Sequence, residues 1–138
     1  MDPVKIGLVG YGFGGRYFHA PLIAAAPECE LLGVVTTSAE RRELVGAEHP
    51  GVDVYDSLAA LAAAGAEAVS ISTPAETHSA LTDEAIELGL SVVCDKPFSM
   101  DPAAARHSVA LAASRGVTLS PDQNRRWEGL VLFLDAAH

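Results

Sequence analysis

The residues best suited to chemistry stand directly after short apolar runs. Lys96 lies between Asp95 and Pro97, and it is one of two lysines in the 138-residue sequence. A lysine amine at such a place can hydrogen-bond a substrate hydroxyl or exchange a proton with it as a general acid or base. The alternative is a surface lysine paired with Asp95. We take Lys96 as the candidate catalytic residue and expect both Asp95 and Lys96 to contact a cofactor.

A second candidate is the glycine pattern Gly10-x-Gly12-x-x-Gly15, which follows a short apolar run and precedes an alanine-rich segment. A strand, a tight turn and a helix N-terminus in this order form the phosphate site of dinucleotide-binding folds. The first glycine permits the bend, the second leaves room for a pyrophosphate, and the third lets the helix pack against the strand. A purely structural turn is the alternative. We expect this turn, with its internal residues Phe13 and Gly14, to bind the cofactor.

The end of the second predicted strand bears on the choice of cofactor. An Asp or Glu roughly 20 residues after the glycines binds the ribose hydroxyls of NAD. Here small hydroxyl side chains stand at that place, and two arginines follow them. Hydroxyls and a guanidinium suit the 2′-phosphate of NADP, which a carboxylate would repel. A solvated helix face is the alternative for the arginines. NADP is therefore favoured over NAD, with a site formed by Thr36, Thr37, Ser38 and Arg41.

Thr73 and Pro74, at the end of the fourth predicted strand, begin a further candidate segment. His78 follows five residues after Thr73, and from the first turn of the next helix it can face the cofactor. A histidine in that place is as often a packing or capping residue. We assign Thr73, Pro74 and His78 to the cofactor site, and we interpret His19 and His107 as structural.

The elements that must position these residues alternate between strand and helix. This rhythm predicts a doubly wound α/β Rossmann fold, with a mostly parallel six-stranded sheet and helices on both faces. Ligands of such sheets bind outside the carboxyl ends of the strands, which is where the candidate residues cluster. A kink is expected near Pro21 inside the first helix. The predicted strands are 6–9, 30–35, 52–55, 68–73, 91–94 and 117–120, and the predicted helices are 16–26, 39–45, 58–64, 76–88 and 102–115.

Composition and charge argue against several other classes of protein. The formal net charge of −9 disfavours a surface that binds nucleic-acid phosphates. Cys29 and Cys94 make neither a disulfide framework nor a Cys/His zinc pattern, so we expect free thiols and no metal. No apolar run has the length of a membrane span, and no secretory leader opens the sequence. We expect a cytoplasmic protein that binds neither nucleic acid nor membrane.

The pattern changes after the sixth predicted strand. Residues 1–120 are predicted to form the dinucleotide-binding domain. A polar loop from Pro121 to Arg126 follows, and then an apolar segment from Trp127 to Leu134 with little after it to cover it. We expect residues 121–138 to begin a truncated C-terminal domain, the rest of which is missing. The uncovered apolar segment also favours a homo-oligomer for the full-length protein.

Four motifs together resemble the N-terminal half of the glucose–fructose oxidoreductase, inositol dehydrogenase and MocA (Gfo/Idh/MocA) family. They are the glycine turn at 10–15, Thr73-Pro74-x-x-x-His78, Asp95-Lys96-Pro97 and Asn124-Arg125-Arg126-Trp127. The run from Phe18 to Ile23 is similar to the subgroup that includes NADP-dependent inositol dehydrogenases. The order and spacing of these short motifs make the resemblance specific.

The resemblance implies a Rossmann domain followed by a larger α/β domain that holds most of the substrate site and the oligomer contacts. It implies hydride transfer between nicotinamide and an alcohol carbon of a small-molecule sugar, polyol or inositol. Lys96 matches the family lysine that positions and protonates or deprotonates that oxygen. The proline that corresponds to Pro97 is often cis. Thr73, Pro74 and His78 match positions near the ribose and nicotinamide, and Asn124 is expected at the cofactor.

Two departures from the family pattern qualify these expectations. Asp95 replaces the usual Glu, so the carboxylate has a shorter reach. The family's second catalytic pair, an Asp and a His on the second domain, has no counterpart in the sequence, and we expect the chain alone to be inactive. A non-catalytic nucleotide-sensing or regulatory module is the alternative function. A different Rossmann dehydrogenase would share the glycine turn but not the motifs around Lys96 and Asn124.

Overall fold

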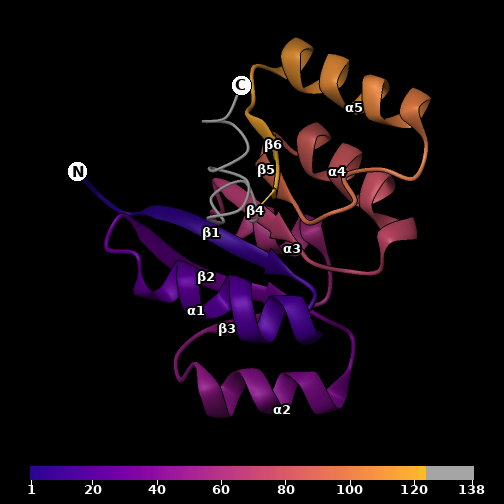
Figure 1. The fold of residues 1–138 in the computed structure, drawn as a ribbon. Coiled ribbons are helices and arrows are strands. Elements are labelled where there is room, and N and C mark those ends of the chain that lie inside the picture. The colour runs from indigo at the N-terminus through magenta and orange to yellow at the C-terminus, as the bar shows by residue number, and fades with distance from the viewer. Residues whose placement is uncertain (124–138) are drawn as a thin grey trace, which may run out of the picture.

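The computed structural model describes residues 1–123, in which strands and helices alternate (Figure 1). A π-helical turn, η1, precedes the first α-helix, and a 3-10 turn, η2, precedes the fourth. The elements are β1 Val4–Val9, η1 Gly15–His19, α1 Ala20–Ala25, β2 Cys29–Val35, α2 Ala39–Glu48, β3 Asp53–Tyr55, α3 Leu58–Ala63, β4 Ala68–Ile71, η2 Ala75–Thr77, α4 His78–Glu87, β5 Ser91–Cys94, α5 Pro102–Arg115 and β6 Leu119–Pro121.

One six-stranded sheet forms the centre of the molecule. Its order is β3-β2-β1-β4-β5-β6, and every pair of neighbours is parallel. The chain therefore adds strands on one side of β1 and then crosses to the other side at β4. This confirms the predicted doubly wound Rossmann sheet, whose ligand crevice lies at the carboxyl ends of β1 and β4, where the strand order reverses.

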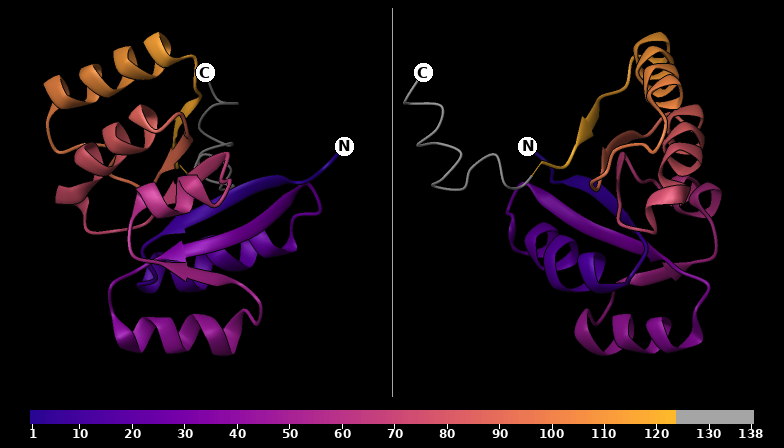
Figure 2. Two further views of the ribbon diagram at one scale, coloured as in Figure 1. Left: turned by 180° about the vertical axis from the view of Figure 1, so that it is seen from behind. Right: turned by 45° about the vertical axis from the view of Figure 1, so that its right-hand side comes forward.

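Helices cover both faces of this sheet (Figure 2). On one face, α1 and α2 enclose a core around Leu8, Val34 and Val45. On the other face, α3, α4 and α5 enclose a second core that includes Val69 and Ile86. β1 contributes buried apolar side chains to both cores, Leu8 to the first and Val9 to the second, which accounts for its continuous apolar run in the sequence.

The predicted first helix, 16–26, divides into η1 and α1. Pro21 stands in the first turn of α1, where a missing N–H group leaves no helical hydrogen bond unmade. The winding therefore changes just before Pro21, while the backbone of His19 and Ala20 stays helical, so the expected kink or break stays a prediction. The sixth strand begins at Leu119 rather than at residue 117, because the Val117 N–H closes the end of α5 by donating to Ala112 O at 3.2 Å.

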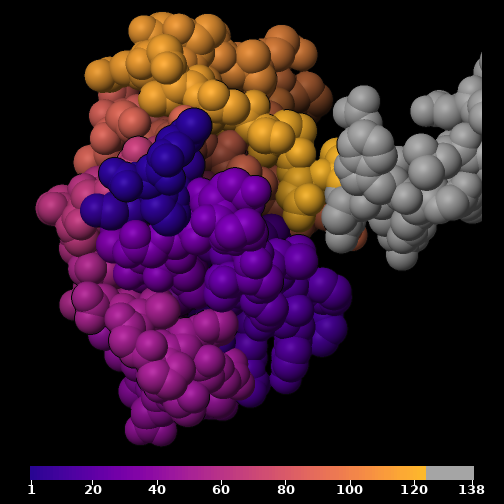
Figure 3. Space-filling model, turned by 90° about the vertical axis from the view of Figure 1, so that its left-hand side faces the viewer, coloured from indigo at the N-terminus to yellow at the C-terminus, as the bar shows by residue number. Residues whose placement is uncertain are grey.

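The two cysteines are free, and Cys94 is buried. Burial raises the pKa of its thiol, as expected for a packing residue. Among the described helices, none has both the length and the apolar character required to cross a membrane. The first residues of the chain lie on the surface between the orange and the purple parts of the space-filling view (Figure 3), and Met1 is fully exposed.

The bend after β1 depends on a glycine at position 10. Gly10 has φ +94°, and a Cβ placed there would lie 2.4 Å from Ser72 O at the end of β4. Gly65 is a matched control, since it has φ +100° with nothing within 4 Å of its Cβ position.

We expect Gly10→Ala to lower the free energy of unfolding by about 2–4 kcal/mol, because backbone strain and a clash with the β4 backbone add together. Gly65→Ala adds backbone strain without a clash, so we expect it to lower the free energy of unfolding by about 1 kcal/mol. Urea denaturation of both variants measures the difference. Equal losses of unfolding free energy in the two variants would show that the clash with the β4 backbone contributes nothing.

Candidate cofactor and active site

The glycines of the first turn meet three different surroundings. A Cβ on Gly15 would lie 2.3 Å from Gly10 O, and one on Gly14 would lie 2.6 Å from Ser72 Oγ. At Gly12 the nearest atom is Arg41 Nη2, 3.8 Å away. Gly10, Gly14 and Gly15 are therefore required by contacts within the protein, whereas Gly12 borders open space. This matches the separate roles that the sequence predicts for the glycines of a pyrophosphate-binding turn.

A cleft of about 300 Å³ lies beside this turn, at the carboxyl ends of β1 and β4. It brings together most of the residues predicted to bind the cofactor. Ser72 is the one lining residue that was not predicted. The lining residues are Gly10, Gly12, Phe13, Gly14, Arg41, Ser72, Thr73, Pro74 and Asp95.

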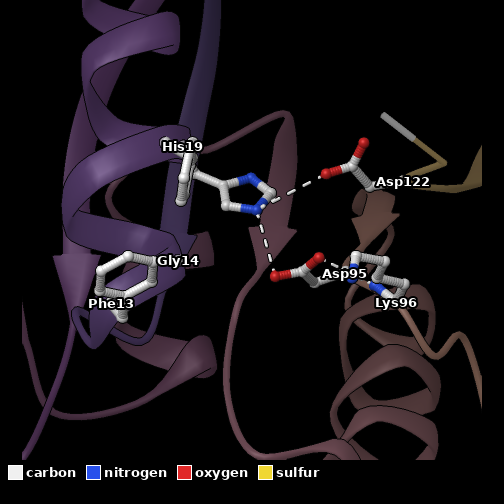
Figure 4. A pocket seen from close by; sticks show the side chains of 7 residues that line it. Phe13, Gly14, His19, Asp95, Lys96 and Asp122 are labelled. Carbon is white, nitrogen blue, oxygen red and sulfur yellow. Dashed lines mark hydrogen bonds and ion pairs between the residues drawn. The ribbon is translucent and has the colours of Figure 1, made fainter. Parts of the chain in front are cut away.

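A second cleft of about 360 Å³ shares Phe13, Gly14 and Asp95 with the first (Figure 4). Its other lining residues are Phe18, His19, Lys96 and Asp122. The two clefts are therefore adjacent, and together they extend from the glycine turn to Lys96; we refer to the pair as the depression. The glycine turn and Lys96 lie on the same edge of the sheet, although 80 residues or more separate them in the sequence.

The Asp95 carboxylate is held by the backbone and by hydroxyl groups rather than by the neighbouring lysine amine. Its Oδ1 accepts a hydrogen bond from the Lys96 backbone N–H at 2.9 Å, and its Oδ2 accepts one from Ser72 Oγ at 3.2 Å. In residues 1–123 no salt bridge involves Lys96, whose side chain is exposed at the cleft. The alternative of a lysine paired with Asp95 is therefore wrong for this structure. The Lys96–Pro97 peptide bond is cis, as the resemblance implies.

His19 is a residue of this site that the sequence interpretation missed. Its Nε2 atom lies 3.4 Å from Asp95 Oδ2 and 3.7 Å from Asp122 Oδ2. The structure therefore places His19 in the cleft, where we had interpreted it as structural. Asp122 directly follows β6, at the carboxyl edge of the sheet. This position in the sequence could have identified Asp122 as a residue of the site. The approach of His19 depends on the path of η1, which the sequence pattern does not specify. His107 is exposed and lies 3.6 Å from Asp83.

His78 does not line either cleft, so the structure sets it apart from most of the residues assigned to the cofactor. The side chain is 1% exposed. Nδ1 lies 2.7 Å from Pro97 O and Nε2 lies 2.8 Å from Thr73 O. Both ring nitrogens are thus engaged with backbone carbonyls, and the imidazole joins the loop after β4 to the loop after β5. The packing alternative describes this histidine better than direct cofactor contact.

The hydroxyl groups after β2 serve the local turn. Thr36 is buried, and its Oγ1 accepts from the Ser38 backbone N–H at 3.3 Å. Ser38 Oγ caps α2 by accepting from the Arg41 N–H at 3.3 Å. Thr37 is exposed, and none of the three lines the two clefts. Arg41 does line the first cleft, so the structure separates the arginine from the hydroxyls with which it was grouped.

The two arginines of α2 have different surroundings. Arg42 forms an ion pair with Asp56. No salt bridge within residues 1–123 involves Arg41, which is exposed beside Gly12. Arg41 is therefore the arginine that remains available to an anion.

Two further residues were predicted to bind the cofactor. Gly15 is buried under the turn, and Asn124 lies outside the described residues.

A charged network ties the turn to α2. Tyr11 Oη donates a hydrogen bond to Glu48 Oε2 at 2.6 Å, and the Arg16 guanidinium pairs with the same carboxylate. The hydrogen bond from Arg16 lowers the pKa of Glu48, while burial raises the pKa of Tyr11. The glycine turn is thereby attached to the last turn of α2.

The sheet order, the turn after β1 and the depression at the switch point define a dinucleotide-binding Rossmann domain. Residues 4–123 match the family model of GFO/IDH/MocA oxidoreductases, described as an NAD-binding Rossmann fold. The chain belongs to this oxidoreductase family, which confirms the resemblance drawn from the four motifs.

Known relatives support this assignment over nearly the whole chain. The Escherichia coli oxidoreductase YdgJ is 41% identical over 134 residues, which are 96% of this chain and 38% of that protein. The scyllo-inositol 2-dehydrogenase (NADP⁺) IolW of Bacillus subtilis is 32% identical over 93% of this chain and 35% of its own. The structure of UDP-N-acetylglucosamine 3-dehydrogenase GnnA from Acidithiobacillus ferrooxidans superposes with a TM-score of 0.87 and 34% identity, covering 99% of this chain and 44% of that one. The chain thus spans less than half the length of these relatives.

Gly12 offers a direct test of the cleft. A methyl group fits there without meeting protein atoms closer than 3.8 Å, but it enters the space beside the turn. We expect Gly12→Ala to change the free energy of unfolding by less than about 1 kcal/mol and to weaken binding of NADH and NADPH by at least about tenfold.

Cofactor fluorescence titration and urea denaturation measure the two quantities. Unchanged affinity in a folded Gly12→Ala variant would place the pyrophosphate elsewhere. Gly10→Ala provides the contrast, since its principal effect is expected on stability.

Proposed function

We propose that this chain is the NADP-binding half of a dehydrogenase that transfers a hydride between nicotinamide and an alcohol carbon of a sugar, polyol or inositol. The observation that carries the proposal is the pair of adjacent clefts that extends from the glycine turn to Lys96. The relatives add support, because IolW and GnnA are named as dehydrogenases of an inositol and of a nucleotide sugar. In this proposal residues 1–120 form the cofactor domain, and residues 121–138 begin a substrate and oligomerisation domain.

The residues present fit a dinucleotide. Gly12 leaves the mouth of the first cleft clear, and Phe13 and Gly14 continue the lining toward Lys96. Backbone groups of a glycine turn suit a pyrophosphate, because no side chain separates them from the anion. In the proposal Thr73 and Pro74 border the path of the cofactor between the turn and the second cleft.

Arg41 favours NADP over NAD. Its guanidinium lies at the first cleft beside Gly12 and forms no salt bridge in the described part of the chain. A 2′-phosphate would gain a charge-assisted hydrogen bond there, whereas the ribose hydroxyl of NAD would gain much less. Thr37 lines neither cleft, so the preference for NADP rests on Arg41.

Lys96 is proposed as the group that exchanges a proton with the substrate oxygen. A nicotinamide held in these clefts would supply hydride transfer to and from the alcohol carbon. In the oxidising direction Lys96 Nζ takes the hydroxyl proton as the carbonyl forms, and it passes this proton to solvent. In the reducing direction it returns a proton to the oxygen. Asp95 Oδ1 accepts a hydrogen bond from the Lys96 backbone N–H at 2.9 Å. This bond fixes the backbone from which the lysine side chain extends.

Substitution of Arg41 tests the cofactor. We expect Arg41→Ala to weaken NADPH binding by about 10–100-fold and NADH binding by less than threefold, because about 1.5–3 kcal/mol of charge-assisted bonding is lost with the phosphate. Arg42→Ala is the matched control, since Arg42 pairs with Asp56 and should affect both cofactors little. Fluorescence titration of each variant gives the affinities. An equal loss for both cofactors would contradict the 2′-phosphate assignment.

Substitution of Lys96 tests the chemistry in the complete dehydrogenase, assayed against a panel of sugars, inositols and other polyols. We expect Lys96→Ala to lower kcat by about 10²–10⁴-fold and to leave the Kd of NADPH within about threefold. Lys96→Arg keeps the positive charge but cannot release a proton near neutral pH, so it should also be slow.

The same experiment distinguishes an enzyme from a regulatory module. A protein that binds NADPH but turns over no member of the panel, with or without Lys96, would favour the nucleotide-sensing alternative. Failure of the wild-type chain to bind NADPH at millimolar concentration would overturn both.

A further inference from the structure

The cleft that holds Lys96 contains a second group able to exchange a proton, the imidazole of His19. This side chain comes from the last residue of η1 and enters the cleft between the ends of β5 and β6 (Figure 4). It is 12% exposed, and its ring points toward Asp95 and Asp122. The proton exchange proposed for Lys96 does not use it, so its placement requires a separate explanation.

The ring is anchored on one side and directed into the cleft on the other. Nδ1 lies 2.8 Å from the hydroxyl of Ser70, a buried residue of β4. Nε2 faces Asp95 Oδ2 at 3.4 Å and Asp122 Oδ2 at 3.7 Å. Because carboxylates only accept hydrogen bonds, Nε2 presents its proton to them, while Nδ1 shares a hydrogen bond with the Ser70 hydroxyl. These distances are long for a hydrogen bond, so the attraction to the two carboxylates is mainly electrostatic.

Two other roles fit the contacts less well. A serine, a histidine and an aspartate in sequence suggest a hydrolytic triad, but Ser70 is 4% exposed inside the sheet and no substrate carbonyl can reach it. The three candidate ligand atoms of His19, Asp95 and Asp122 also lie within 4.8 Å of one another, as in a metal site. The cationic amine of Lys96 lines the same cleft and disfavours a second cation there.

We propose that His19 is a positioning residue of the active site, which holds the Asp95–Lys96 segment against the first helix. The proposal rests on the proposed function, since it assigns His19 a part in the same reaction. The Asp95 carboxylate binds the Lys96 N–H through Oδ1 and faces Ser72 and His19 through Oδ2. Movement of Asp95 is therefore transmitted to the backbone from which the Lys96 amine extends.

Loss of the imidazole has a specific consequence. His19 stands between two carboxylates, and without it Asp95 and Asp122 face each other with like charges and no N–H group between them. The repulsion displaces Asp95, and with it Lys96, from the position beside Gly14. Asp95 is the one member of this cluster that also lines the first cleft, whose other lining residues, Gly12 and Arg41 among them, are not in contact with His19. His19 therefore affects turnover more than cofactor affinity.

The test compares His19→Ala, His19→Asn and His19→Gln in the complete dehydrogenase, with His107→Ala as the control for an exposed histidine. The Gln amide reaches toward Asp95 as Nε2 does, whereas the shorter Asn amide stays near Ser70. We expect His19→Ala and His19→Asn to lower kcat about 10–100-fold with NADPH affinity within about threefold, and His19→Gln to recover most of the rate. Asp122→Asn combined with His19→Ala should restore part of the rate by removing the repulsion.

Three results would overturn the proposal. One is a His19→Ala enzyme with full kcat, and another is equal rates in the Gln and Asn variants, each with the urea midpoint of the wild type. A third is an activity that requires added Zn²⁺ or Mg²⁺ and loses this requirement in His19→Gln, since this would assign the cluster to a metal. The proposed function fails separately, through unchanged turnover in Lys96→Ala or absent NADPH binding in the wild type.

Discussion

The close approach of the first turn to the end of β4 is the constraint on which the rest of the structure depends. Gly10 lies against Ser72 O, and Gly14 lies against Ser72 Oγ. A Cβ on Gly14 would also lie 3.2 Å from Asp95 Oδ2. At Gly10 the obstacle is backbone, so no side chain larger than hydrogen fits there, whereas at Gly14 the Ser72 hydroxyl would have to move. Because the turn sits this close, the loops after β1, β4 and β5 stack into one edge, and Lys96 comes within the same depression as Gly12.

The regular part of this architecture was predictable from the sequence. Apolar runs bounded by glycine, proline and capping residues indicate strands and helices through local chemistry alone, and their alternation implies a parallel sheet. Ser38 and Asp101 cap α2 and α5 as their positions suggest. The ends of elements were less predictable, because backbone bonds such as that from Val117 to Ala112 O decide where a helix closes.

The candidate site was predictable where backbone geometry sets it and less so where side chains meet across the fold. Gly10, Gly12, Gly14, Arg41, Thr73, Pro74, Asp95 and Lys96 follow from their places at strand ends, and all of them line the depression. The two histidines exchanged their expected roles: His78 braces two loops from the interior, while His19 enters the cleft. Their partners lie between 5 and 103 residues away in the sequence, and neither residue type nor spacing specifies such pairings.

The π-helical form of η1 explains how one short helix serves two purposes. An α-helix turns by about 100° per residue, and a π turn accommodates an extra residue before the regular winding resumes. Here the widened turn lies between Gly15, packed on the strand, and His19, directed toward β5 and β6. Removing one residue from this segment would swing every later side chain of the helix around its axis. The count of residues between the phosphate turn and Pro21, more than their chemical types, therefore sets the direction of the imidazole.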